Sequence, residues 1–214
     1  MKSAVICFIG TDGAGKSTLL SEAKKELEKN QSLKVPTVYF GWKPFLPTTK
    51  LISNLFKKKN YQITTQMNKK EQKFSLLQEA MLGYYFIEYL SRYIFQIKLP
   101  LLKNFSKKQK QVMLVDRYFY DLYAHYQYAE KSFIFPTLLR IMPKPDLIIF
   151  LDVNTETAKK RKPEMDPELL KEHCQRYQKL SKLIEAKIVK TDQELEPSVN
   201  EVLRAIQEKV TKKQ

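Results

Sequence analysis

Cysteine is scarce in this chain, and its scarcity narrows the kinds of site that the protein can contain. The 214 residues include two cysteines, Cys7 within an apolar run and Cys174 within a predicted helix. This usage indicates buried thiols rather than a disulfide framework or a zinc site. We therefore expect a reducing, cytoplasmic location.

Long uncharged apolar runs are also absent. No stretch reaches the length that a membrane-spanning helix needs, so we expect no membrane span. The apolar residues after Lys2 end at Gly10, which makes this run too short for a signal peptide. A chain of 214 residues suffices for one α/β domain with a full core but not for two, so we predict a single domain over 1–214.

Negative charge is in deficit, because 23 acidic side chains face 38 lysines and arginines and leave a net charge of +15. Such a balance is compatible with nucleic-acid binding, with a field that collects polyanionic nucleotides, or with a solvated lysine-rich surface. The lysine clusters lie in predicted loops and at the C-terminus, without the interleaved aromatic residues that stack on single strands. The pattern does not favour a nucleic-acid partner.

Glycine is rare as well, yet three of the five glycines fall within the stretch 10–18. That stretch reads GTDGAGKST and fits the phosphate-binding pattern G-x-x-x-x-G-K-[ST]. An apolar run at 4–9 precedes it and an amphipathic helical pattern follows, so backbone N–H groups and a helix N-terminus would surround an anion. We predict that a nucleoside triphosphate binds here, to Gly10, Asp12, Gly13, Ala14, Gly15, Lys16, Ser17 and Thr18.

Predicted strands and helices alternate along the rest of the chain. Strand patterns occupy 34–41 (despite Pro36), 111–115, 147–153 and 186–189. Helical patterns occupy 48–58, 74–99, 155–162, a segment that starts at 167, and 197–210. This alternation predicts an α/β protein with the three-layer P-loop NTPase fold, in which helices cover both faces of a parallel sheet.

The loop after the predicted strand 34–41 is expected to face the phosphate loop, because ligands bind at the carboxyl ends of parallel strands. Here Lys43 could meet an acceptor phosphate and Trp42 could stack on a base. The alternative is that Trp42 and Phe45 simply anchor the loop in the core.

A second polar group follows the predicted strand 111–115. Asp116 stands at its end, where an acidic residue beside a phosphate loop usually binds Mg²⁺, and Arg117 would point toward the transferred or acceptor phosphate. In the aromatic segment that follows, Tyr120 and Asp121 are our candidates for acceptor contacts, and we interpret His125 as a packing residue.

Two further features have alternative interpretations. In the predicted helix 74–99, Glu88 and Arg92 form an ion pair, or Arg92 faces a substrate anion. The segment at about 159–168 is either a small lid that closes over the phosphates or an ordinary basic helix end. Asp166 is expected to cap the next helix, with Pro167 at its first position.

Together these motifs resemble the thymidylate kinase family of nucleoside monophosphate kinases. The resemblance runs nearly from end to end, through the loop with its Asp12, the sequence VDRY at 115–118, and the segment 145–153. It implies that Lys16 and the loop amides hold the ATP phosphates, and that Ser17 and Asp116 hold Mg²⁺. It also implies that Arg117 and Arg92 hold the acceptor phosphate, that Asp12 lies near the acceptor sugar, and that Arg161 is the lid arginine.

The chain departs from the family on the acceptor side. The family's Arg-Glu-Pro-Gly-Gly-Thr segment is replaced by 42–47, and Asp121 stands where the family usually has serine. We predict an ATP-dependent and Mg²⁺-dependent kinase of nucleotide biosynthesis that phosphorylates a nucleoside monophosphate, dTMP first, with Lys16, Arg117 and Arg161 as catalytic residues.

Two alternative functions stay open at this point. The same fold could phosphorylate another metabolite such as a sugar derivative, or it could bind nucleotide without kinase activity. The strongly apolar helix at 74–99 also predicts a homodimer.

Overall fold

The computed structural model describes residues 3–30, 33–41, 43, 45–49, 76–105 and 110–211. Trp42, and the predicted helix at 48–58 beyond Thr49, lie outside the described residues.

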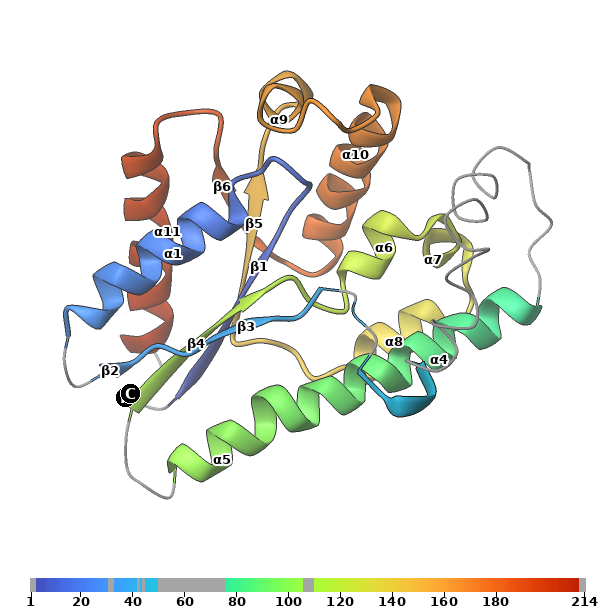
Figure 1. Ribbon diagram of the computed structural model, residues 1–214, viewed down its shortest axis with the longest axis horizontal. Coiled ribbons are helices and arrows are strands. Elements are labelled where there is room, and N and C mark those ends of the chain that lie inside the picture. The colour runs from blue at the N-terminus through green and yellow to red at the C-terminus, as the bar shows by residue number, and fades with distance from the viewer. Residues whose placement is uncertain are drawn as a thin grey trace.

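Six parallel strands form the sheet at the centre of the molecule (Figure 1). They are β1 (Ala4–Ile9), β2 (Leu33–Lys34), β3 (Thr37–Tyr39), β4 (Lys110–Asp116), β5 (Leu147–Asp152) and β6 (Lys187–Lys190). Their order is β2-β4-β1-β5-β6, and β3 also pairs with β4. Because Phe8 pairs with Asp116, the end of β4 lies directly beside the loop that follows β1.

Helices cover both faces of this sheet, as the alternating side chains of β1 require. One face packs against α1 (Lys16–Glu28) and α11 (Leu195–Thr211), and the other packs against α4 (Leu76–Arg92) and α10 (Pro167–Leu183). Side chains of β1 enter both cores: Ala4, Ile6 and Phe8 on the first face, and Val5, Cys7 and Ile9 on the second. The predicted α/β fold of the P-loop NTPase kind is therefore confirmed.

The single strand predicted at 34–41 is wrong in detail. The structure has two short strands there, β2 and β3, separated by Val35 and Pro36. Proline lacks an N–H group and cannot donate to the ladder, although the Pro36 carbonyl still accepts a hydrogen bond from the Leu114 amide at 2.9 Å. The proline thus interrupts the strand without removing it from the neighbourhood of β4.

The long apolar helix extends beyond its predicted end. After α4 the chain continues as a π-helix, η1 (Tyr93–Lys98), and then as α5 (Leu99–Phe105). Because α5 continues η1 without a break, Pro100 lies inside one helical run, where its missing N–H and its ring would disturb an ordinary α-helical turn. A wider turn just before a proline is one way for a helix to accommodate it.

The described residues also form four shorter helices: α6 (Asp121–His125), α7 (Gln127–Lys131), α8 (Phe135–Ile141) and α9 (Thr155–Arg161). The predicted cap of α10 is confirmed, because the Asp166 side chain accepts hydrogen bonds from the amides of Glu168 and Leu169, and Pro167 opens the helix. Asn154 caps α9 in the same way. No helix among the described residues is both long and apolar enough to span a membrane.

The packing of α10 on the sheet generates a stability prediction. Leu180 is fully buried in the core, whereas Leu183 on the same helix is 61% exposed. We expect Leu180→Ala to lower the free energy of unfolding by about 2–5 kcal/mol, because it leaves a cavity. The matched change Leu183→Ala should cost no more than about 0.5 kcal/mol in the same urea titration. Equal losses in the two variants would contradict this packing.

Candidate active site

The loop between β1 and α1 has a backbone that only glycine adopts easily. Gly10, Gly13 and Gly15 have φ angles of 152°, 83° and 80°. A Cβ atom on Gly10 would lie 2.8 Å from the Leu151 carbonyl oxygen, and one on Gly13 would lie 2.7 Å from that of Ala158. The loop is therefore held against the end of β5 and the middle of α9 at distances that exclude a side chain.

Lys16 lies at the centre of this loop. Its ammonium group donates hydrogen bonds to the carbonyls of Gly10 at 2.8 Å and Thr11 at 2.7 Å, and the residue is 7% exposed. Burial lowers the pKa of Lys16 to about 8, with Arg117 acting in the same direction and Asp12 in the opposite one. Ser17 and Thr18 follow on the first turn of α1 and are exposed.

Asp116 ends β4 beside the loop. Burial raises the pKa of Asp116 above its usual value, and within the described part of the chain its Oδ1 atom is buried without a hydrogen-bond partner. A buried carboxylate oxygen left without a donor, at the strand end beside the glycine loop, suits a hard cation such as Mg²⁺. Among the described residues, no three acidic, histidine or cysteine side chains are placed so that they could hold a metal ion together, so a metal here would also need oxygens from a ligand.

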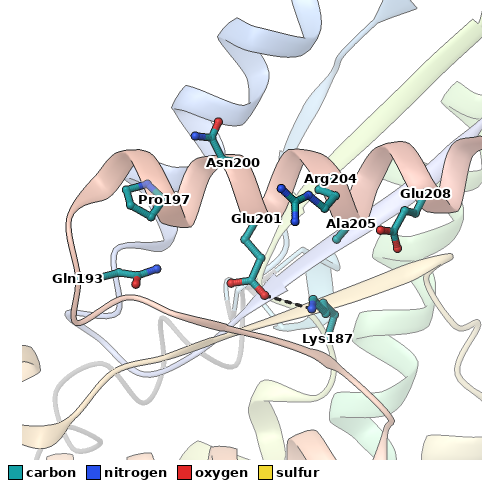
Figure 2. A pocket seen from close by; sticks show the side chains of 8 residues that line it. All are labelled: Lys187, Gln193, Pro197, Asn200, Glu201, Arg204, Ala205 and Glu208. Carbon is teal, nitrogen blue, oxygen red and sulfur yellow. Dashed lines mark ion pairs between the residues drawn. The ribbon is translucent and has the colours of Figure 1, made fainter.

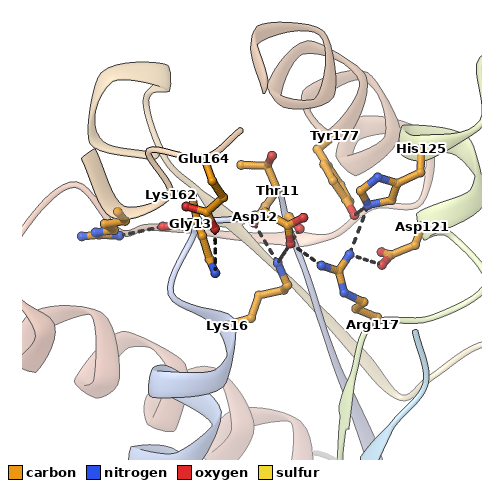
Figure 3. A network of polar contacts seen from close by, with 12 residues as sticks. Thr11, Asp12, Gly13, Lys16, Arg117, Asp121, His125, Lys162, Glu164 and Tyr177 are labelled. Atoms are coloured by element: carbon orange, nitrogen blue, oxygen red, sulfur yellow. Dashed lines mark hydrogen bonds and ion pairs between the residues drawn. The ribbon is translucent and has the colours of Figure 1, made fainter. Parts of the chain in front are cut away.

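Arg117 lies between two carboxylates (Figure 3). Its Nη2 atom donates to Oδ1 of Asp12, and its Nη1 atom donates to Oδ2 of Asp121 at 2.8 Å. Nη1 also lies 3.1 Å from Nε2 of His125. Although burial opposes the charged form, Asp121 and the other neighbours raise the pKa of Arg117. Burial raises the pKa of Asp12, but Arg117 and Lys16 outweigh it and lower that pKa.

The two histidines of the protein lie together behind Arg117. Their ring centroids are 4.5 Å apart in an edge-to-face arrangement, and the Tyr177 hydroxyl lies 3.2 Å from Nε2 of His125. Burial lowers the pKa of His125, and burial followed by the proximity of His125 lowers that of His173 to about 3. Sequence reasoning treated His125 as packing alone. Its position four residues after Asp121 is the signal that could have linked it to the site.

Glu88 and Arg92 each contact the segment that follows β3. Arg92 is 3% exposed and donates to the carbonyls of Gly41 at 2.6 Å and Tyr39 at 2.9 Å. Glu88 accepts hydrogen bonds from the Leu46 amide at 3.2 Å and the Thr49 hydroxyl at 2.7 Å. Both side chains therefore hold the segment that follows β3 against α4.

The other predicted acceptor contacts are spread over different places. The Lys43 ammonium lies 4.7 Å from the centre of the Tyr39 ring. Phe45 packs against Phe95 with ring centroids 5.9 Å apart, which agrees with its interpretation as an anchor. Tyr120 is 2% exposed and packs on Tyr118, so the structure places it in the core.

Arg161 reaches the phosphate loop from the end of α9. Its Nη2 atom donates to the Thr191 carbonyl at 2.8 Å, and its Nη1 atom donates to the Gly13 carbonyl at 3.2 Å. Together with Gly15, Thr18 and Gln193 it lines a hollow of about 240 Å³ next to the start of α1. Sequence reasoning did not anticipate that Thr191, after β6, would be part of this wall.

A larger hollow of about 440 Å³ lies along α11, where Lys187 forms an ion pair with Glu201 at 3.1 Å (Figure 2). None of the residues that line it belongs to the glycine loop or to the segment 116–121. The charged and polar side chains that could bind a ligand's phosphates therefore gather around the glycine loop, and not around this larger hollow.

Comparison with known proteins agrees with this fold. No protein-family model matches the chain, and no curated protein matches its sequence. The structure is similar to the crystal structure of thymidylate kinase from Ehrlichia chaffeensis, with a TM-score of 0.57 and 19% identity over 97% of this chain and 100% of that chain. This chain has a thymidylate kinase-like fold. At 19% identity this similarity establishes the fold alone, so any argument about function has to rest on the residues of the site.

The buried histidine pair generates a prediction about acid stability. The pKa of His173 is about 3 in the folded protein against a usual 6.5, so below pH 6.5 the unfolded chain binds a proton that the folded chain does not. Stability should therefore fall as the pH drops from 6.5 toward 3, with a slope of about 1.4 kcal/mol per pH unit from this group.

Urea unfolding of the wild type and of His173→Phe between about pH 8 and pH 5 checks this prediction. The variant should lose that part of the slope, because phenylalanine cannot titrate. The difference at pH 8, where histidine is neutral, reports packing alone. Parallel curves for the two proteins would show that His173 is not the group concerned.

Proposed function

We propose that the protein is an ATP-dependent phosphotransferase that moves the γ-phosphoryl group of ATP to a small-molecule acceptor. The observation that carries this proposal is the glycine loop itself, with Lys16 at its centre and Asp116 at the adjacent strand end. A loop of this kind, at the N-terminus of a helix, surrounds phosphate with backbone N–H groups. The thymidylate kinase-like fold supports the same function.

In this proposal Lys16 exchanges its two carbonyl partners for phosphate oxygens of ATP, and Arg161 approaches the nucleotide from α9. Ser17 and Asp116 would hold Mg²⁺, which would neutralise part of the charge on the phosphates. The hollow beside Gly15 would receive the part of the nucleotide beyond its phosphates. Transfer then depends mainly on alignment and on stabilisation of the developing charge by these cations.

The acceptor is open to two candidates. A nucleoside monophosphate, with dTMP as the first to test, is suggested by the structural neighbour's name and by the sequence motifs. A different metabolite, such as a sugar derivative, is favoured by the two carboxylates that hold Arg117. Dimer formation through α4 and a cytoplasmic location stay predictions.

Replacing Lys16 tests the nucleotide site. We expect Lys16→Ala to reduce turnover by roughly 10²–10³-fold, by analogy with the loss of one preorganised donor in other enzymes. It should also weaken Mg·ATP binding, measured by calorimetry. Lys24→Ala is the matched control, because Lys24 lies on the same helix with its side chain 38% exposed and pairs with Glu28 at 3.7 Å.

The control should bind Mg·ATP as the wild type does. Absence of a binding signal from a folded wild-type sample would reject the phosphotransferase proposal. Binding without ADP release in the presence of any acceptor would instead favour a nucleotide-binding protein without kinase activity.

A further inference from the structure

The two arginines expected to hold an acceptor phosphate already have protein partners. Arg117 donates to carboxylates of Asp12 and Asp121. Arg92 is almost fully buried and uses both terminal nitrogens for the carbonyls of Tyr39 and Gly41. In both side chains the two terminal nitrogens already donate to protein oxygens, so a phosphate would have to share or displace these contacts.

The charge of Arg117 is also compensated locally. Asp12 and Asp121 both form ion pairs with its guanidinium, and the carboxylate of Asp116 lies close enough to influence the same group. A phosphate monoester carries about two negative charges at neutral pH, so binding it here would place like charges together.

Asp121 is the residue that sets this balance. It is 4% exposed, and its Oδ2 atom forms the 2.8 Å ion pair with Arg117. Its Oδ1 atom is buried without a hydrogen-bond partner among the described residues. Burial of a carboxylate costs free energy of desolvation. Here the buried carboxylate of Asp121 offsets the positive charge of Arg117.

We propose that the acceptor presents a hydroxyl group, and not a phosphate monoester, to the γ-phosphate, and that Asp121 sets this choice by neutralising Arg117. The inference rests on the proposed phosphotransferase function and specifies its substrate class. A hydroxyl group brings no charge into the site, so the compensated arginine does not oppose it.

Asp12 is placed to bind that hydroxyl. Both of its ion pairs, with Arg117 and with Lys16 at 3.8 Å, go through Oδ1, and its side chain is 36% exposed. The acceptor oxygen forms a bond to the γ-phosphorus, while the bond from that phosphorus to the β,γ-bridging oxygen breaks and ADP leaves with its electron pair. The hydroxyl proton passes to the carboxylate of Asp12 and from there to solvent.

Arg117 is then a positioning residue, and His125 supports it. The donor Nη1 atom of Arg117 and the Tyr177 hydroxyl both approach Nε2 of His125, which suits a neutral imidazole that accepts at this atom. Asp121 and His125 thus fix the guanidinium, and the guanidinium in turn fixes the carboxylate of Asp12.

Binding of methyl phosphate, the smallest organic monoester, tests the inference directly. The P-loop is first saturated with Mg²⁺ and a non-hydrolysable ATP analogue, and methyl phosphate is then titrated by calorimetry into wild type, Asp121→Ser and Asp121→Asn. We expect no saturable binding to the wild type. Both variants should show saturable binding, at least about tenfold tighter than the detection limit of the wild-type titration, because one carboxylate charge no longer neutralises Arg117.

The surface variant Glu201→Gln removes the same charge on α11, in an ion pair with Lys187, and should behave as the wild type. Saturable binding of methyl phosphate to the wild type, or equal binding to wild type and folded Asp121 variants, would overturn the inference. The melting temperature and the affinity for the ATP analogue show whether the variants fold, and the wild-type titration decides the matter if they do not.

Matched acceptor pairs provide the catalytic readout. Thymidine with dTMP, glucose with glucose 6-phosphate, and glycerol with glycerol phosphate are each incubated with wild-type protein and Mg·ATP, and the products are identified by mass. A phosphorylated alcohol supports the inference, and conversion of a monoester into a diphosphate overturns it. If the ATP analogue does not bind, both the proposed function and the inference are wrong. If the analogue binds and methyl phosphate also binds to the wild type, only the inference is wrong.

Discussion

The close approach of the glycine loop to β5 and α9 is the constraint on which the rest of the site depends. Backbone carbonyls of Leu151 and Ala158 occupy the space that side chains on Gly10 and Gly13 would need. Because this contact ties the end of β1 to the end of β5, it also fixes where α9 begins and where Arg161 lies. The parallel register of β1 with β4 then places Asp116 on the opposite side of the same loop.

Sequence patterns predicted those parts of the fold that depend on residues close together in the chain. The apolar runs of β1, β4 and β5 are buried on both faces, and the glycine motif and the Asp166 cap depend on residues that are neighbours in the chain. The split of β2 from β3 at Pro36 was visible in the sequence but was underestimated. The π-helix before Pro100 could not be predicted, because composition and periodicity do not show how a helical run accommodates a proline.

The partners of the charged residues could not be predicted in the same way. Arg117 and Asp12 are 105 residues apart, and Arg92 and Gly41 are 51 residues apart, so their contacts depend on the complete fold. A motif indicates which cations are available but not whether a carboxylate or a carbonyl already occupies them. For this reason the glycine loop follows from the sequence, whereas the partners of Arg117 and Arg92 follow only from the structure.

The wide turn at Tyr93–Lys98 lets one continuous helical run serve two surfaces. On its N-terminal side α4 holds the segment after β3 through Glu88 and Arg92, and on its C-terminal side α5 lies against β4. An α-helix turns by about 100° per residue, so gaining or losing a single position between them would rotate one contact face away from its partner. The rotation of this helix about its own axis, more than its length, therefore determines whether it can contact both the segment after β3 and strand β4.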